Sequence, residues 1–166
     1  ANGSINESSQ FEIIDGEIRS INYRLNDTIR RNPRESVVDF DWSKKTIQGF
    51  YKDRMIDFNI ERRILTRILL QIEIMHQKQR NNLKDSYLII DKDEIKEIEI
   101  TSSNSGKKIS VPFGSYEVVE VSHRSKNSNR INTFWLAPDL DFIPVKLEQT
   151  EGNKVNFEAN LVQLTR

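Results

Sequence analysis

The chain has 166 residues, and its 25 Lys and Arg side chains balance its 25 Asp and Glu side chains. The length suggests one domain, and a net charge of +0 argues against a general attraction to nucleic acid or anionic lipid. The chain has no cysteine, which excludes disulfides, thiolate metal ligands and cysteine nucleophiles. No apolar run comes near the ~18 residues of a membrane-spanning helix, so the sequence predicts no transmembrane segment.

The N-terminal part combines a polar end with strand patterns. Residues 1–10 are small and polar, so the sequence predicts a disordered end followed by a single β-rich domain over 11–166. Alternating apolar and polar residues over 38–42 predict a strand, because side chains on a strand point to opposite faces in turn. The segment 46–60 predicts a hairpin that turns at 52–54.

The apolar period then changes from that of a strand to that of a helix. It predicts one amphipathic helix over about 61–79, with Asn59 or a neighbour as its cap. The expected apolar stripe consists of Leu65, Ile68, Leu69, Ile72 and Met75. Leu70 and Ile74 lie off this stripe, so the apolar arc is wider than one packing contact needs. These two residues are therefore candidates for lining a ligand groove between helix and sheet.

Strand patterns resume after the helix and continue to the end of the chain. Turn signals separate them at 91–93, 112–114, 125–129, 138–139 and 152–153. This succession predicts a mainly β (α+β) fold, a curved antiparallel meander that forms an open or half barrel with the helix packed on it. In the last strand, the residues expected to face the interior are Val155, Phe157, Ala159 and Leu161.

The stretch TFWLAPDLDFIPVKLEQ is the most distinctive in the chain. Its Asp139 and Asp141 could act in acid–base or metal chemistry, but Pro138 and Asp139 also suit the centre of a type I turn. Pro144 cannot donate to a strand ladder and belongs at an edge or a bulge. Trp135 is either a core residue or a ligand-stacking platform. The stretch therefore predicts a structural corner between two strands.

Other chemical signals are weak. His76 and His123 have no ligand residues at metal-binding spacing, and a catalytic triad cannot be argued from spacing alone. The pair Asp91 and Asp93 resembles the start of a calcium loop, but the glycine and glutamate that such a loop needs are missing. We therefore expect no catalytic residues, no metal site and no cofactor.

Four segments resemble the bacterial domain of unknown function family 3108. They are FDW at 40–42, PFGSYEVVEV at 112–121, the run from Arg130 to Gln149, and the closing NFEANL. The positions that the resemblance marks as structural are Trp42, Gly114, Arg130, Phe134, Trp135, Pro138, Asp139, Asp141 and Pro144. The resemblance implies a periplasmic or secreted protein of a Gram-negative bacterium with no assigned activity. It also implies that an export signal and one or two strands are missing at the N-terminus.

Three hypotheses about function remain open at this point. The first is a non-catalytic envelope protein that binds an apolar or amphipathic ligand on the concave face of its sheet, with Leu70, Ile74 and Trp135 as candidate contacts. The second is an interaction or scaffold module that meets another envelope protein through sheet edges or basic loops. The third is a hydrolase whose catalytic groups come together only in the fold. A contiguous apolar pocket would favour the ligand, and a filled interior would favour the module.

Overall fold

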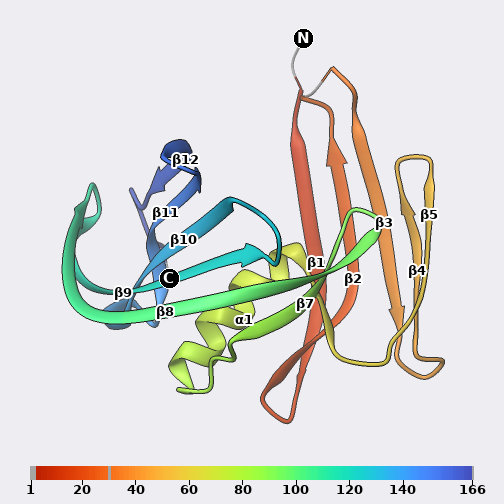
Figure 1. Ribbon diagram of the computed structural model, residues 1–166, viewed down its shortest axis with the longest axis horizontal. Coiled ribbons are helices and arrows are strands. Elements are labelled where there is room, and N and C mark those ends of the chain that lie inside the picture. The colour runs from red at the N-terminus through yellow and green to blue at the C-terminus, as the bar shows by residue number, and fades with distance from the viewer. Residues whose placement is uncertain (1–2, 30, 166) are drawn as a thin grey trace. The chain divides into compact units, whose positions relative to one another are not determined.

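The computed structural model describes residues 3–29 and 31–165 (Figure 1). This part of the chain is mainly β, with one α-helix and open sheets, which confirms the fold class predicted from the sequence. Contacts between residues group the chain into two compact units. Unit 1 comprises Ala1–Glu73 and Leu88–Lys96, and unit 2 comprises Ile74–Tyr87 and Glu97–Arg166. The single domain expected over 11–166 is therefore divided between two units.

Unit 1 contains an antiparallel sheet in which each strand pairs with the next along the chain (Figure 1). Its strands are β1 (Ile5–Ile14), β2 (Glu17–Asp27), β3 (Arg34–Asp41), β4 (Thr46–Tyr51) and β5 (Arg54–Asn59). The β1–β2 hairpin turns at Asp15 and Gly16, which both have positive φ angles of 52° and 78°. Positive φ at both central residues is the mark of a tight hairpin turn, which explains the Asp-Gly pair there.

A second sheet has the strand order β12-β11-β10-β9-β8-β7-β6 among the described residues. Its strands are β6 (Ile64–Thr66), β7 (Ser86–Asp91), β8 (Glu94–Val111), β9 (Gly114–Ser125), β10 (Arg130–Ala137), β11 (Ile143–Glu151) and β12 (Lys154–Asn160). From β8 to β12 the pairs are antiparallel, whereas β6 and β7 run parallel. A parallel pair needs a crossover, and the helix α1 (Arg67–Gln79) supplies it.

Each unit has its own apolar core. The core of unit 1 consists of Tyr23, Leu25, Val38, Phe40, Ile47, Tyr51, Ile56, Ile60, Ile64 and Ile90. The core of unit 2 includes Val118, Trp135, Ala137 and Val145. In unit 2 the amide of Phe113 donates to the carbonyl of Leu161 at 3.1 Å, which ties the tip of the β8–β9 hairpin to the chain after β12.

The helix begins later than predicted. Residues 61–66 were expected to be helical, but Ile64–Thr66 forms strand β6, and α1 starts at Arg67. All three residues of β6 are buried, as strands of parallel pairs commonly are, and a short apolar run fits either a strand or a helix. The Thr66 hydroxyl accepts the amide of Leu69 at 3.4 Å, so Thr66 caps the helix in place of the expected Asn59.

Two further expectations are wrong. The disordered end predicted over 1–10 is not found at residues 5–10, which lie in β1 and pair with β2, while Ala1 and Asn2 lie outside the described residues. In β12, Val155 and Phe157 were expected to face the interior, but they are 50% and 55% exposed. The reason is that β12 is the last strand of its sheet and its register with β11 shifts near these residues.

Candidate functional site

The distinctive stretch after Arg130 forms a corner in unit 2, as the sequence predicted. Strand β10 ends at Ala137, and the 3-10 turn η1 (Pro138–Leu140) follows with Asp139 exposed in it. Asp141 closes the turn with a left-handed backbone (φ 56°), and its amide donates to the Pro138 carbonyl at 3.1 Å. Pro144 lies opposite Leu136 beside a shift in the β10–β11 register. The two aspartates therefore shape a turn.

Trp135 belongs to the core of unit 2. Its side chain is 7% exposed and packs with Val118 and Val145. The ammonium groups of Lys107 and Lys146 lie 5.6 and 5.0 Å from the centre of its ring, within the range of cation–π attraction. The indole Nε1 has no hydrogen-bond partner among the described residues. These contacts favour the core interpretation of Trp135, and its role in ligand binding stays a prediction.

The helix candidates for ligand binding are also core residues. Leu70 is 2% exposed and Ile74 is 0% exposed. Neither side chain lines the surface hollows described below. Their part in a ligand groove therefore also stays a prediction.

Two of the aromatic residues in the family motif stabilise strands. The Nε1–H of Trp42 donates to the Ser20 carbonyl at 2.8 Å, which ties the end of β3 to β2. Phe134 is buried in β10, with its ring centre 5.1 Å from that of His123 on β9.

The remaining motif residues, Gly114 and Arg130, lie at the ends of strands. Gly114 has a φ of 154°, and a Cβ atom there would lie 2.8 Å from the Tyr116 hydroxyl. Arg130 is exposed at the start of β10 and pairs with Glu151 on β11 at 3.3 Å. This φ angle, which residues with a side chain rarely adopt, explains why the hairpin carries glycine at position 114.

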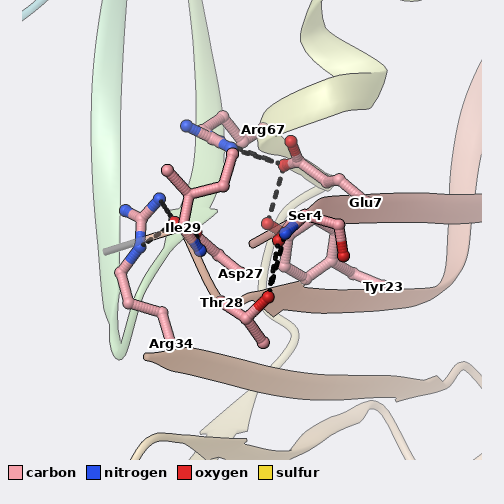
Figure 2. A network of polar contacts seen from close by, with 8 residues as sticks. All are labelled: Ser4, Glu7, Tyr23, Asp27, Thr28, Ile29, Arg34 and Arg67. Atoms are coloured by element: carbon pink, nitrogen blue, oxygen red, sulfur yellow. Dashed lines mark hydrogen bonds and ion pairs between the residues drawn. The ribbon is translucent and has the colours of Figure 1, made fainter. Parts of the chain in front are cut away.

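A polar network that the sequence did not reveal lies at one end of unit 1 (Figure 2). One carboxylate oxygen of Glu7 on β1 accepts the Tyr23 hydroxyl at 2.7 Å and the Arg67 Nη2 at 2.6 Å. Burial and the bond to Glu7 raise the pKa of the Tyr23 hydroxyl, which therefore stays protonated as a donor. Just before β1, the amide of Ser4 donates to the Thr28 hydroxyl at 2.9 Å. The network fixes β1 to β2 and to the start of α1.

A buried ion pair completes this end of unit 1 (Figure 2). Asp27 at the end of β2 is fully buried, and its Oδ2 accepts the Arg34 Nε at 2.9 Å. Its Oδ1 accepts the Ile29 amide at 3.1 Å. Pairing of this kind is needed because an unpaired buried charge is costly. The loop between β2 and β3 is therefore held from both of its ends.

The strand that this network fixes, β1, has several exposed apolar side chains. Strand β1 is the first strand of its sheet and, among the residues that the structure describes, pairs only with β2. In this part of the chain its outer edge therefore presents backbone N–H and C=O groups without a neighbouring strand. We call its four exposed apolar side chains and this edge the β1 edge surface. They are Ile5 (51% exposed), Phe11 (39%), Ile13 (55%) and Ile14 (41%).

The register shows which way these side chains point. Phe11 lies opposite Ser20, and Ile13 lies opposite Ile18. Both partners on β2 are fully buried. Residues that lie directly opposite each other share a face of the sheet, so Phe11 and Ile13 extend the buried face of the sheet out to its open edge.

The surface hollows of unit 1 are open and mixed in character. One hollow, of about 510 Å³, lies over the strand ends of β1, β2 and β3, and Asn6, Arg24, Asn26, Glu35 and Val37 contribute to its lining. A second hollow, of about 380 Å³, is lined by Pro33, Arg34, Lys52 and Asp53 among others. A ligand pocket of the usual kind is lined predominantly by apolar groups, whereas polar and apolar groups line these hollows in comparable amounts.

The described residues contain no group of three or more His, Asp or Glu side chains that could hold a metal ion. The carboxylates of Glu7 and Asp27 are both engaged by arginines. In the same part of the chain, no helix is long and apolar enough to cross a membrane.

These features define a mainly β protein of two open sheets, with four exposed apolar side chains on the edge strand β1. The chain belongs to the family described as Protein of unknown function (DUF3108), whose model matches residues 5–159. This match confirms the resemblance seen in the sequence. Comparisons with curated proteins and with solved structures found no match.

Proposed function

We propose that this protein is a non-catalytic interaction module of the bacterial envelope, which binds an extended segment of another protein along the β1 edge surface. The observation that carries the proposal is the open edge of β1 with its four exposed apolar side chains. Proteins commonly protect such an edge with charges, proline or a covering segment, and an edge that stays open is a template for another strand.

The physical basis is strand addition. A segment laid beside β1 would gain main-chain hydrogen bonds from the open edge, and its alternate apolar residues would pack beside Phe11 and Ile13. Fully burying an apolar side chain of this size is worth about 1.5–3 kcal/mol. Since these two are 39% and 55% exposed, covering them contributes roughly 1 kcal/mol each. The expected partner segment alternates apolar and polar residues.

The Glu7 network supports this proposal because it orders the strand in advance. Tyr23 and Arg67 hold β1 at Glu7, and the Thr66 and Ser9 hydroxyls lie 3.0 Å apart. A binding edge that is already ordered loses less conformational freedom when a partner arrives.

A carrier of apolar ligands has weaker support. Its three candidate contacts, Leu70, Ile74 and Trp135, are all buried, and none of them lines the hollows of unit 1. Export to the periplasm is part of the proposal, and it rests on what the family resemblance in the sequence implies. Cell fractionation would test the export, and retention of the full-length protein in the cytoplasm would contradict the periplasmic part of the proposal.

The β1 edge can be tested by crosslinking in cells that make the protein. A photoreactive residue at position 13 should capture one specific partner. The same residue at position 55 should not, although Met55 on β5, the other edge strand of this sheet, is 80% exposed. With the purified partner, Ile13→Glu should weaken binding at least about tenfold and Met55→Glu less than about twofold. Equal capture from both positions, or equal loss in both variants, would contradict the proposal.

A further inference from the structure

We propose that the hollow at the C-terminal end of α1 binds a small oxyanion, a phosphate or a carboxylate, through the ammonium group of Lys78. This site lies within unit 2 and is independent of the β1 edge surface. The hollow has a volume of about 240 Å³, and its lining includes Lys78, Asn81, Lys84, Ile100 and Ser102. This space accommodates a tetrahedral or planar anion but not a large ligand.

Lys78 is the central group because its charge has no carboxylate partner in the part of the chain that the structure describes. Its Nζ donates to the Ser102 hydroxyl at 3.2 Å and lies 3.5 Å from the Asn104 side-chain oxygen. Both acceptors are neutral, and an ammonium group has three donors. Burial lowers the pKa of Lys78, because part of the ammonium group is removed from water. An anion in the hollow would supply the missing charge.

The chain around Lys78 is held in a fixed geometry. The amides of Asn81 and Asn82 donate to the carbonyls of Lys78 and Gln77 at 3.1 and 2.9 Å, so these two carbonyls in the last turn of the helix are occupied. Asn81 adopts the left-handed conformation (φ 53°) that commonly ends a helix. The carbonyls of Gln77 and Lys78 are therefore satisfied and repel an incoming anion less than free carbonyls would.

The opposite wall of the hollow is also fixed. The amide of Ile100 on β8 donates to the Asp85 carbonyl at 2.8 Å, which ties the loop after the helix to the sheet. Lys84 adds a second positive charge to the lining, and Asp85 adds one negative charge. With Lys78 included, the titratable side chains that line the hollow carry a net positive charge, which favours an anion.

Inorganic phosphate is the first probe. In an amide-resolved NMR titration of the full chain, it should shift the signals of Asn81 and Ser102 and saturate with a Kd of about 1 mM or lower. Lys78→Gln should weaken the binding at least tenfold. Lys108→Gln is the matched control, because it removes the same charge from an exposed position on β8, and it should change the Kd less than twofold. The pKa of Lys78 should rise when phosphate is added.

Titrations with other probes distinguish a free anion from a lipid headgroup. Saturation by phosphate or acetate supports a free oxyanion as ligand. Binding to phosphatidylglycerol vesicles but not to phosphatidylcholine vesicles or free phosphate, with loss in Lys78→Gln, supports a lipid headgroup. Absence of saturable shifts with all probes, or equal weakening in Lys78→Gln and Lys108→Gln, would overturn the proposal.

Discussion

Histidine 123 should make the stability of this protein sensitive to mild acid. It lies on β9, between Ile100 on β8 and Asn132 on β10, and its ring packs against Phe134 at 5.1 Å. Burial lowers the pKa of His123 from 6.5 to about 4, because the charged imidazolium would lose its hydration. In the unfolded chain the same side chain titrates near its ordinary value.

The sign of the effect follows from the two pKa values. Above pH 6.5 the imidazole is neutral in both states and does not affect the free energy of unfolding. As the pH falls from 6.5 towards 4, the unfolded chain takes up a proton that the folded protein does not, so the folded state loses stability. Each pKa unit corresponds to about 1.4 kcal/mol, so the loss reaches about 3 kcal/mol at pH 4.

The assay is chemical denaturation of the wild type and of His123→Gln at pH 7.5, 6, 5 and 4. The difference in unfolding free energy between the two should change by about 3 kcal/mol across this range, in favour of the variant at low pH. Any pH-independent cost of the substitution cancels in this comparison. His76→Gln is the control, because it removes the other histidine of the chain, which lies on α1. A difference between wild type and His123→Gln that stays constant with pH would refute the reasoning.

Three further predictions concern packing, and each is measured as a change in unfolding free energy. Trp135→Ala should cost about 3–5 kcal/mol, because the ring is 7% exposed in the core of unit 2, and a loss below about 1 kcal/mol would contradict this. Gly49→Ala should cost at least about 2 kcal/mol, because a Cβ at a φ of 155° would lie 1.9 Å from the Val37 carbonyl oxygen. Leu70→Glu should destabilise the protein by more than about 3 kcal/mol, while Gln71→Glu should change little.

Local patterns in the sequence predict those parts of the fold that depend on neighbours along the chain. The hairpin expected over 46–60, with its turn at 52–54, is confirmed by β4 and β5. The corner at Pro138 is confirmed by the 3-10 turn there. It could be predicted because proline and aspartate both favour turns. The predicted start of the helix was wrong because a buried run of three residues is too short to show whether its hydrophobic period is that of a strand or of a helix.

The β1 edge surface could not be predicted from local patterns. Its anchor joins Glu7 to Arg67, 60 positions along the chain, and no motif marks such a pair. The polar residues that suggested disorder in 1–10 are the ones that make these contacts. One signal was present in the sequence, since Asp15 and Gly16 follow an alternating run and form a typical hairpin turn. That signal predicts where the hairpin turns, but it does not predict that the apolar side chains of the outer strand are exposed.

The helix shows how far a hydrophobic period determines burial. Ile72 belongs to the expected apolar stripe and yet is 37% exposed, whereas Leu70 and Ile74 lie off the stripe and are buried. The buried face also contains Glu73, which is fully buried. A carboxylate is tolerated at position 73 because Arg63 pairs with it at 2.7 Å and the Ile18 amide lies 3.4 Å from its second oxygen.

Leu70→Glu would place a second carboxylate on this buried face without such an arrangement. Replacing a buried leucine by a smaller residue already costs about 2–5 kcal/mol, and an unpaired carboxylate adds the cost of its desolvation. Gln71→Glu introduces the same group one position along, where the side chain is exposed, and so controls for charge and helix propensity. Retained stability in Leu70→Glu would mean that the new carboxylate reaches solvent. Position 70 would then border an accessible groove, and the ligand-carrier hypothesis would regain its support.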